Sequence, residues 1–559
     1  MRGKKMKVTG ARAVVECLVE QQVNTVFGYP GGMILPLYDA LYGENRIQSV
    51  VNVHEQCAAH AADGYARATG RVGVCIATSG PGATNLITGL AAAFMDSIPV
   101  IAITGQVETG SLGHDAFQEI DILGATMSVT KHNFAVKTAQ ELPETVRLAF
   151  KIALSGRPGP VLIDIPQDIL REEIEFRGEP AYQKIMPALS ERSMEMIGKA
   201  ARIISEAKRP LVLSGGGVIS AGASAELFKL VEKCQFPVVH TLMGLGGFPD
   251  GHDQSIGLSG MHGWPTANHA VHDADVVIAV GTRLSDRLTG NRDRYAHDKR
   301  IIHIDVDPAE IAKNVSTDIG IAGDIRTILG LLTVDVEPND ITAWWDEIHA
   351  WQDKFRYRYP EGKLTVPWAM RQISNLTLDK PCIYVTDVGQ HQMWAAQHIV
   401  VNHPRTWLTS GGLGAMGFSL PAALGAQIAR PDKRVIHIAG DGGMRMTGNE
   451  LYTIASLKLP IISVVVDNNG LGMIRQLQKV FYNDRYCACR FTHPMDFAMY
   501  ANSFGIDSVT VSTQEEFLSA MKEALAEERP RVIVIRVEED FVDPMAKPKA
   551  PINQFVDFK

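Results

Sequence analysis

Apolar runs of strand length alternate along this chain with segments of helix length. The runs cover residues 72–78, 100–104, 161–165, 211–214, 276–280, 301–305, 435–439 and 461–466. Near the start, Thr9 is predicted to cap a helix that ends at about Glu20, and residues 25–27 are predicted to form a short strand. Continuous apolar strands separated by helices are typical of parallel sheets buried on both faces. The pattern predicts the α/β fold class, with doubly wound domains.

The length of the chain, 559 residues, exceeds what one hydrophobic core normally organises, and three domains are expected. Two stretches lack the alternation. Residues 171–192 are charged and hold two prolines, and residues 336–366 are rich in Asp, Glu, Trp and Tyr. We interpret both as interdomain connections. The predicted domains therefore cover residues 1–172, 190–335 and 366–545, followed by a C-terminal tail over 546–559.

The chain also contains an internal echo. Residues 74–104 read strand, Ser-Gly-Pro-Gly, helix, Ile-Pro, strand, and residues 435–466 read strand, Gly-Asp-Gly-Gly, helix, Leu-Pro, strand. With an offset of 361, Gly82 falls on Gly443 and Pro99 on Pro460. Either the first and third domains share one topology, with room for a ligand between them, or any two βαβ units look alike at this level.

Composition narrows the possible partners. The net charge of −8 is modest and no basic stripe is visible, so nucleic acid and anionic membranes are poor candidates. No apolar run reaches the ~18 residues that a membrane span needs. Seven scattered cysteines form no CxxC pair, and the CxC of Cys487 and Cys489 is interpreted as incidental. We expect a protein of the reducing cytoplasm that acts on small molecules.

The strongest local signal combines two strand ends. Asp441, Gly442 and Gly443 follow one apolar strand, and Asn468 ends the next strand 27 positions later. Glycines let a backbone approach a diphosphate closely, and a helix N-terminus offers free N–H groups. A carboxylate, an amide oxygen and diphosphate oxygens together suit Mg²⁺. Whether Asn468 or its neighbour Asn469 would be the ligand stays open.

This pairing resembles the thiamine-diphosphate motif of the decarboxylase and carboligase superfamily. By that resemblance the metal ligands are Asp441, Asn468 and the carbonyl of Gly470. Glu55, at the start of an Ala-rich helix, would by itself be a helix-capping residue. In the superfamily a glutamate at this place hydrogen-bonds the pyrimidine N1′ of the cofactor, which requires a protonated carboxyl.

Longer stretches resemble the catalytic large subunit of acetohydroxyacid synthase, also called acetolactate synthase, over nearly the whole chain. They are residues 27–32 (FGYPGG), 54–56 (HEQ), 64–68 (GYARA), 78–85 (TSGPGATN), 115–119 (DAFQE), 131–133 (KHN), 157–160 (RPGP), 214–217 (SGGG), 260–263 (GMHG), 281–287 (GTRLSDR), 387–394 (DVGQHQMW) and 411–417 (GGLGAMG). The resemblance implies two thiamine-diphosphate-binding domains that flank a Rossmann-like middle domain. The implied cofactors are thiamine diphosphate, Mg²⁺ and a structural FAD.

The resemblance also assigns site residues. Those implied to contact thiamine diphosphate are Tyr29, Pro30, Glu55, Thr78, Asn85, Val388, Gln390, His391, Met416, Asp441, Gly442, Gly443, Asn468, Gly470 and Met473. Met416 would bend the cofactor. Those implied to contact FAD are Arg157, Gly215, Gly216, Gly217, Met261, His262, Arg283, Asp305 and Asp324.

The implied reaction is acetolactate synthesis, the first step of branched-chain amino-acid biosynthesis. Pyruvate is decarboxylated and its two-carbon unit joins a second 2-oxoacid, either pyruvate or 2-oxobutyrate. Gly32, Phe117 and Gln118 would line the reaction centre with Glu55. Arg283 would pair with the acceptor carboxylate, beside Met473 and Leu477.

Two positions depart from the family. Biosynthetic members usually carry Trp in place of Leu477, where it favours 2-oxobutyrate and forms part of the herbicide site. Leucine predicts a weak preference for 2-oxobutyrate and low sensitivity to sulfonylurea-type inhibitors. Gln167 stands where many members have Lys, and the tail from Asp540 onward is less family-like.

Other functions remain as alternatives. One is a pyruvate oxidase or another carboligase of the same superfamily, and another is a catalytically silent cofactor-binding protein. Glu55, Gln118, Asp441 and Asn468 occur together, which argues against a silent protein. Family members are dimers or tetramers with each thiamine site between two subunits, and many bind a small regulatory subunit. The sequence decides neither that partner nor a biosynthetic over a catabolic role.

Overall fold

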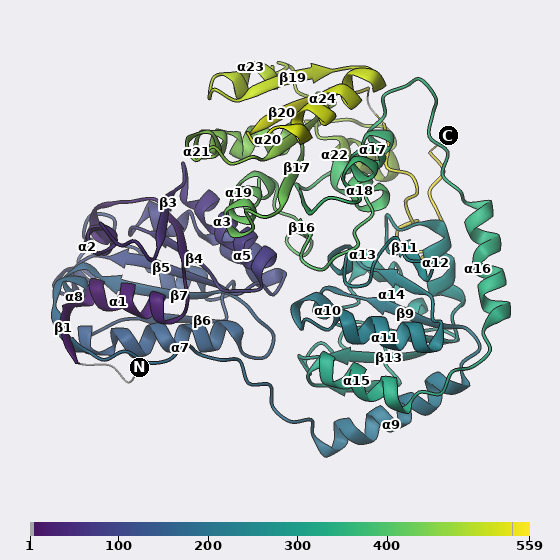
Figure 1. Cartoon of the computed structure of the whole chain (residues 1–559), viewed down its shortest axis with the longest axis horizontal. Coiled ribbons are helices and arrows are strands. Elements are labelled where there is room, and N and C mark those ends of the chain that lie inside the picture. The colour runs from purple at the N-terminus through teal and green to yellow at the C-terminus, as the bar shows by residue number, and fades with distance from the viewer. Residues whose placement is uncertain (1–4, 539, 559) are drawn as a thin grey trace.

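A computed structural model describes residues 5–538 and 540–558 and contains three six-stranded parallel sheets (Figure 1). The first sheet has the order β3-β2-β4-β5-β7-β6, the second β11-β10-β9-β12-β13-β14, and the third β16-β15-β17-β18-β20-β19. All pairings within these sheets are parallel. The α/β, doubly wound fold class expected from the sequence is confirmed.

The strands of the first sheet are β2 Thr25–Gly28, β3 Gln48–Val51, β4 Gly73–Ala77, β5 Val100–Gln106, β6 His132–Ala135 and β7 Val161–Pro166. Those of the second are β9 Pro210–Ser214, β10 Val238–His240, β11 Ser255–Leu258, β12 Val276–Val280, β13 Arg300–Asp305 and β14 Ile319–Ala322. Those of the third are β15 Cys382–Thr386, β16 Trp407–Thr409, β17 Arg434–Gly440, β18 Ile462–Asp467, β19 Asp507–Val511 and β20 Arg531–Arg536. Each apolar run named above lies on one of these strands.

Helices cover both faces of each sheet. The first domain has α1 Gly10–Glu20, α2 Leu35–Leu41, α3 Glu55–Thr69, α4 Pro81–Thr84, α5 Ile87–Met95, α6 Ile122–Thr126, α7 Leu142–Leu154 and α8 Gln167–Arg171. The middle domain has α9 Glu191–Glu206, α10 Gly216–Ser220, α11 Ser224–Cys234, α12 Pro265–Asp273, α13 Asp286–Thr289, α14 Arg292–Tyr295 and α15 Ile325–Asp335. The third has α17 Val366–Thr377, α18 Gln390–His398, α19 Ser419–Ala429, α20 Asp441–Thr447, α21 Leu451–Ser456, α22 Gly472–Tyr482, α23 Phe497–Asn502 and α24 Gln514–Ala526.

The internal echo is present in the topology. The first sheet and the third place their strands in the same order, with β2 corresponding to β15, β4 to β17 and β5 to β18. The offset of 361 carries the start of β4, Gly73, onto the start of β17, Arg434. The middle sheet has the order of a classical dinucleotide-binding fold, 3-2-1-4-5-6 when its strands are counted along the chain.

The two regions read as connections differ from each other. Residues 177–190 contain no helix or strand and join the first domain to α9, which lies at the bottom of Figure 1. Just before them, β8 Glu173–Phe176 pairs antiparallel with β1 Met6–Thr9. Residues 336–366 contain the helix α16 Thr342–Lys354, which runs along the right edge of Figure 1. The three tryptophans of this second stretch lie on that helix, and Trp344 is buried against the middle domain.

The first and third domains share a core built on small residues. Helices α3 and α19 cross so closely that a side chain on Gly425 would lie 1.9 Å from the carbonyl oxygen of Ala61. A side chain on Gly64 would likewise lie 2.2 Å from the carbonyl of Ala422. Figure 1 shows these helices between the two sheets. The first and third domains of one chain are therefore packed against each other as a unit.

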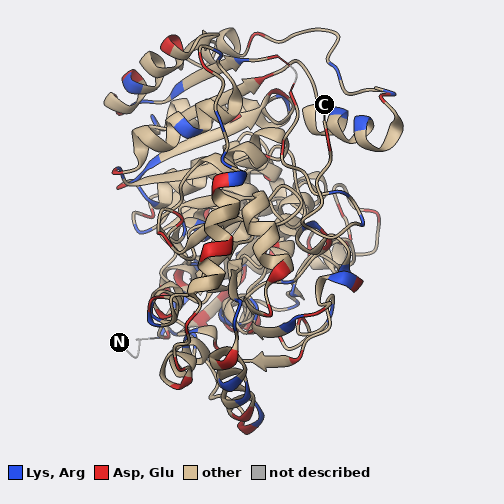
Figure 2. Cartoon of the chain, turned by 90° about the vertical axis from the view of Figure 1, so that its right-hand side faces the viewer, with Lys and Arg blue, Asp and Glu red and all other residues tan. Residues whose placement is uncertain are grey.

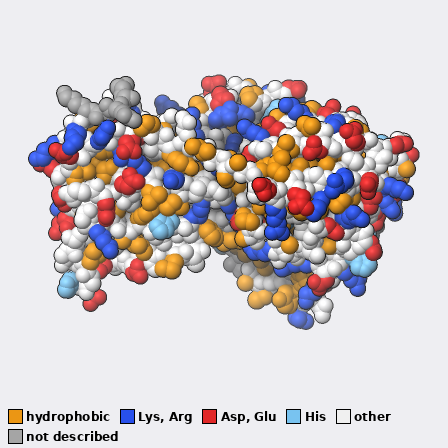
Figure 3. Space-filling model, turned by 90° about the horizontal axis from the view of Figure 1, so that it is seen from below, with side chains coloured by type: hydrophobic (Ala, Val, Ile, Leu, Met, Phe, Trp, Pro, Cys, Tyr) orange, Lys and Arg blue, Asp and Glu red, His pale blue; other side chains and the backbone are white. Residues whose placement is uncertain are grey.

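Charges of both signs are interspersed over the elements seen in Figure 2. Seen from below in Figure 3, the first domain and the middle domain form two bodies that meet at a narrower waist. Among the helices that the structure describes, none combines the length and the apolar character needed to cross a membrane.

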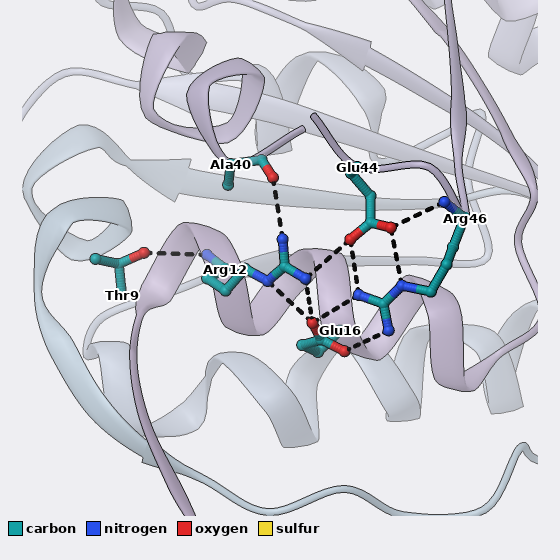
Figure 4. Close-up of polar contacts among 6 residues, drawn as sticks. All are labelled: Thr9, Arg12, Glu16, Ala40, Glu44 and Arg46. Carbon is teal, nitrogen blue, oxygen red and sulfur yellow. Dashed lines mark hydrogen bonds and ion pairs between the residues drawn. The ribbon is translucent and has the colours of Figure 1, made fainter. Parts of the chain in front are cut away.

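One ion-pair network fixes the N-terminal helix to the first sheet (Figure 4). Glu44 accepts hydrogen bonds from Arg12 at 2.8 Å and Arg46 at 2.7 Å, and Glu16 is paired with the same two arginines. The side chain of Glu44 is only 5% exposed. Hydrogen bonds from Arg46 lower the pKa of Glu44 from 4.5 to about 2.

We expect Glu44→Gln to lower the free energy of unfolding by about 1–2 kcal/mol at pH 7. Because the folded-state pKa is depressed, the stabilisation is fully present above about pH 4.5 and falls as the pH drops toward 2. Urea unfolding of both proteins at pH 7 and pH 3 measures this. The difference between them should shrink at pH 3, and an equal difference at both values would contradict the assignment.

Candidate active site

The predicted site residues lie at the carboxyl ends of the strands where the strand order reverses. In open α/β sheets, ligands bind at this position. The reversal lies between β15 and β17 in the third sheet, between β2 and β4 in the first, and between β9 and β12 in the second. The loops that follow these strands carry Asp387 and Asp441, Tyr29 and Thr78, and Gly215 and Arg283, respectively.

Asp441 is the first residue of α20 and is held by backbone donors. Its two carboxylate oxygens accept hydrogen bonds from the N–H of Gly442 at 2.8 Å and of Gly470 at 2.9 Å. The residue is 2% exposed, and burial raises its pKa to about 7. Among the residues that the structure describes, no arginine or lysine forms an ion pair with this carboxylate, as would be expected where a cation binds.

The two neighbouring asparagines are placed differently. Asn468 lines the main cavity of the chain. Asn469 has a left-handed backbone (φ 55°) and donates its side-chain N–H to the carbonyl of Phe491 at 3.1 Å. The geometry therefore favours Asn468 over Asn469 as a ligand. Among the described residues, no group of three or more His, Cys, Asp and Glu side chains is arranged to hold a metal.

The loop that carries Met416 is fixed by Asp387. Both oxygens of this carboxylate accept the N–H of Gly417 at 3.0 Å, and the residue is 1% exposed. His391 lies beside it, and burial lowers the pKa of His391 to about 4, so its ring is neutral. Its Nε2 is buried and has no hydrogen-bond partner within the described chain. Val388, Gln390, His391 and Met416 all line the cavity, together with Gly442, Gly443 and Gly470.

The pyrimidine-side residues gather separately, in the first domain. Glu55 begins α3 and accepts a hydrogen bond from the side-chain amide of Asn85 at 3.0 Å. Thr78 follows β4, and its hydroxyl accepts the N–H of Met33 at 3.2 Å. Gln118 has a left-handed backbone (φ 63°) and packs against Gly80, where any side chain would collide with it.

The first-domain cluster is open to solvent in a single chain. Phe117 is 81% exposed and Tyr29 is 43% exposed, and Pro30 and Gly32 are also exposed. The exposure of Phe117 argues against simple core packing at this position. None of Tyr29, Gly32, Glu55, Thr78, Asn85, Phe117 and Gln118 lines the cavity that holds Asp441 and Asn468. One chain thus contains two half-sites that do not face each other across its cavity.

The cavity itself has a volume of about 1070 Å³ and is lined by residues of all three domains. Its middle-domain wall includes Gly216, Gly217, Met261, His262, Arg283 and Asp305, and Arg157 reaches it from the first domain. Gly215 and Gly217 pack against Gly281, where a Cβ would approach backbone atoms to 2.2 Å and 2.5 Å. His262 is 9% exposed with no partner for Nδ1, and burial lowers its pKa to about 4.

Two of the predicted FAD contacts have other bonds. Asp324 does not line the cavity; it caps α15 by accepting hydrogen bonds from the N–H and the hydroxyl of Thr327. The short polar side chain at a helix start explains that placement. Arg157 does line the cavity, but its guanidinium also donates to Glu310 at 2.7 Å and to Ser97 at 2.7 Å.

The predicted substrate residues line the same cavity, Arg283 from the middle domain and Met473 and Leu477 from α22. Sequence reasoning missed Arg287, whose guanidinium is 73% exposed with Asp286 at 3.5 Å and which also lines the cavity. It lies in the predicted segment 281–287, so only its role was overlooked. Gln167 lies elsewhere: it donates to the carbonyl of Gly32 at 2.7 Å, on the first-domain half-site.

Comparisons with known proteins agree with this arrangement. The N-terminal TPP-binding domain of thiamine pyrophosphate enzymes matches residues 8–125, the central domain residues 197–332, and the C-terminal TPP-binding domain residues 387–535. The chain is 44% identical to a probable acetolactate synthase large subunit of Methanocaldococcus jannaschii, over 98% of this chain and 95% of that protein. The chain belongs to the acetolactate synthase large-subunit family.

Two further relatives show the same range of similarity. The acetolactate synthase of Arthrospira platensis is 45% identical over 96% of this chain and 95% of its own length. The acetolactate synthase large subunit of Corynebacterium glutamicum is 45% identical over 96% of this chain and 87% of its own length. As a member of the acetolactate synthase family, the chain is a thiamine-diphosphate-dependent enzyme that forms carbon–carbon bonds. The matched ranges fall within the three predicted domains, whose boundaries stay predictions.

Proposed function

We propose that this chain condenses two molecules of pyruvate to 2-acetolactate, with release of carbon dioxide, and also accepts 2-oxobutyrate as the second 2-oxoacid. Such a reaction supplies the first step of branched-chain amino-acid biosynthesis. The observation that carries the proposal is the pair of half-sites. Glu55 with Asn85 forms one of them, and Asp441 with Asn468 forms the other, in a chain of the acetolactate synthase family.

The residues at the diphosphate half-site fit Mg²⁺. A buried carboxylate whose pKa burial raises to about 7 lies beside an amide side chain at the same sheet edge. Asp441, Asn468 and the carbonyl of Gly470 would be the ligands, and diphosphate oxygens would complete an octahedral set. The free Nε2 of the neutral His391 offers a hydrogen-bonding group to the same cofactor.

The cavity next to this half-site fits FAD. It combines the glycine loop after β9 with the unpartnered Nδ1 of His262, and its volume is suited to a large cofactor. Gly215, Gly216, Gly217, Met261, His262, Arg283 and Asp305 are the residues we propose to contact FAD. We do not include Asp324 in this set, because its side chain caps α15. FAD would have a structural role, because acetolactate formation involves no net oxidation or reduction.

When bound, thiamine diphosphate supplies the carbanion chemistry of decarboxylation and ligation. The chain would hold the Mg²⁺ through Asp441 and Asn468, and Met416 would support the cofactor on the loop that Asp387 keeps in place through Gly417. Glu55, oriented by Asn85, would hold the proton at the pyrimidine ring. Gln118, Phe117 and Gly32 would border the reacting carbon on the first-domain side.

Two arginines are candidates for the acceptor carboxylate. The family resemblance assigns this role to Arg283. Arg287 has the more exposed guanidinium and lines the same cavity. A guanidinium recognises a carboxylate through two parallel N–H donors, so either suits a 2-oxoacid. Met473 and Leu477, from α22, provide the apolar surface for the alkyl group of the acceptor.

We expect Leu477→Trp to raise the preference for 2-oxobutyrate over pyruvate by about tenfold, because the two acceptors differ by one methylene and a larger apolar wall discriminates it. Product ratios from mixtures of the two oxoacids measure this preference. Leu378→Trp is the matched control, since Leu378 is 50% exposed at the end of α17. An unchanged ratio in Leu477→Trp would remove Leu477 from the acceptor pocket.

We further propose that the working enzyme is a dimer or a larger homo-oligomer. The first-domain half-site is open, and large apolar side chains are exposed on the first and third domains, including Tyr42, Phe117, Met127, Tyr452 and Met499. A second copy would cover these residues and bring Glu55 of one chain to Asp441 of the other. Two relatives carry the name large subunit, and we propose that a separate regulatory subunit binds this chain too.

The deciding experiment is product analysis after incubation with pyruvate, thiamine diphosphate, Mg²⁺ and FAD, with and without 2-oxobutyrate. We expect 2-acetolactate, together with 2-aceto-2-hydroxybutyrate when 2-oxobutyrate is present. A pyruvate oxidase would instead bleach FAD when pyruvate is added without oxygen. Bleaching without acetolactate would overturn the proposal. All seven cysteines are free, so the assay is run under reducing conditions.

A further inference from the structure

Helix α22 has one fully buried residue, and that residue is polar. Its residues Met473, Leu477 and Phe481 line the cavity. Only Gln476 among the residues of this helix is fully buried, at 0% exposure. A helix normally buries an apolar stripe, and a buried amide must have its hydrogen bonds satisfied. The hydrogen bonds of this carboxamide therefore help to position α22, together with the apolar contact that Met473 makes with the core.

The amide of Gln476 is bonded on both sides. Its oxygen accepts the side-chain N–H of Gln390 at 2.9 Å and the backbone N–H of Val542 at 2.8 Å. Its nitrogen donates to the carbonyl of Val542 at 3.1 Å and lies 3.5 Å from the sulfur of Met545. The side chain of Gln476 thus pairs with both backbone groups of Val542, as a neighbouring strand would. This pairing fixes the C-terminal tail, residues 540–558, in one position along α22.

Gln390 continues this network toward the loop between β18 and α22 that carries Asn468, which we call the metal loop. Its nitrogen donates to Gln476 and to the carbonyl of Asp540 at 2.8 Å, and its oxygen lies 3.5 Å from the side-chain nitrogen of Asn468. Gly472, the first residue of α22, lies so close that a Cβ there would be 2.0 Å from the Gln390 oxygen. The start of α22, the loop after β15 and the proposed metal ligand Asn468 therefore meet at one amide.

The tail beyond Val542 closes the other side of the cavity. Met545 and Pro548 line it, and the N–H of Ala546 donates to the carbonyl of Met261 at 2.6 Å. The tail then folds back on itself, with Lys547 bonded to Gln554 and Val556 to Met545. Figure 1 shows it in yellow, passing from beside α17 and α18 toward β11 and α12.

We infer that Gln476 is a positioning residue that joins the tail, α22 and the metal loop into one unit. Through Gln390, Gln476 couples the position of Asn468 to the position of the tail. Because Gln476 lies on α22, it also holds in place Met473 and Leu477, which form the proposed binding surface for the acceptor. The inference deepens the proposed function and rests on it, since it takes Asn468 as a ligand of the Mg²⁺ that binds the diphosphate. Binding at the metal loop should then stabilise the tail, and the reverse must also hold.

Amide hydrogen exchange of the tail, with FAD present throughout, tests this coupling. The informative amides are those of Ala546, Lys547 and Val556, because Gln476 does not touch them. In the wild type we expect Mg²⁺ and thiamine diphosphate to slow their exchange by about fivefold or more. In Gln476→Leu, the same additions should leave their exchange within about twofold. A merely structural loosening would speed exchange equally with and without cofactor and leave this ratio unchanged.

Gln427→Leu is the matched control. Gln427 is also a buried amide, at 2% exposure, with three backbone partners (Arg430, Lys433 and Val435), but it lies on α19. It should keep the wild-type ratio. Gln476→Met provides a second variant if the leucine protein does not fold. Equal slowing in the wild type and either Gln476 variant would overturn the inference. Calorimetric titration with Mg²⁺ and thiamine diphosphate is run on the same samples. If the proposed function is wrong, the wild type shows no binding; if only the role of Gln476 is wrong, the wild type binds but the exchange ratios of wild type and variant are equal.

Discussion

Glu55→Gln should reduce the rate of acetolactate formation by at least about 100-fold, because proton transfer at the pyrimidine ring requires a carboxyl group. The fold should survive. Asn85 donates its N–H to Glu55 at 3.0 Å, and a glutamine oxygen can accept the same bond. The rate of deuterium exchange at C2 of bound thiamine diphosphate, followed by NMR, should fall in parallel with turnover.

Glu108→Gln is the control for this change. Glu108 lies in the same domain, beyond the end of β5, and is exposed with Arg171 at 3.1 Å. Its turnover should match the wild type. A Glu55→Gln enzyme that exchanges the C2 proton and turns over at the normal rate would contradict the role of Glu55.

A mixing experiment with the same variant tests whether the site is shared between two chains. We expect the Glu55→Gln and Asp441→Ala proteins each to have little activity alone at a Mg²⁺ concentration that just saturates the wild type. If every site takes Glu55 from one chain and Asp441 from the other, a hybrid dimer has one intact site. Random reassociation should then restore about a quarter of the wild-type rate, because half of the dimers are hybrids with one good site of two. If both residues of a site came from one chain, mixing would restore nothing.

The sequence predicts some buried strands directly, but it missed three interior ones, β10, β15 and β20. Residues 276–280 form a continuous apolar run, and the observed β12 is Val276–Val280, because a strand covered on both faces has no polar alternation. The edge strand β19, Asp507–Val511, is mixed in character and only partly buried, and its pattern did not identify it. The pairing of β1 with β8 joins residues far apart in the chain and leaves no local signal.

The same contrast holds in the site. The Gly-Asp-Gly segment can be recognised in the sequence because glycine and a carboxylate are required where a strand ends beside a diphosphate. Asp324 was predicted to contact a ligand but caps α15 instead, and an aspartate before a helix serves either purpose. Gln476 gave no sign at all: its partners Gln390 and Val542 are 86 and 66 positions away, and only the folded chain brings them together.

The largest effect on cofactor binding is expected from Asp441→Ala. We expect the Mg²⁺ concentration for half-maximal binding of thiamine diphosphate to rise by about 100-fold or more, because the only carboxylate of the proposed ligand set is lost. The same change leaves the N–H groups of Gly442 and Gly470 without their acceptor, so the loop loses order as well as charge. Quenching of protein fluorescence during titration at several Mg²⁺ concentrations gives the value directly.

The same Mg²⁺ titration, applied to variants of Asn468 and Asn469, tests which of these two asparagines is the metal ligand. Asn468→Ala should raise the Mg²⁺ requirement by about tenfold or more, since it removes a neutral ligand from the cavity wall. Asn469→Gly is the matched change one residue later. Glycine accepts the left-handed backbone at this position, and only the bond to the carbonyl of Phe491 is lost. The Mg²⁺ requirement of Asn469→Gly should stay within about twofold of the wild type. The opposite ranking would move the ligand to Asn469 and would require the loop to shift by one residue when Mg²⁺ binds.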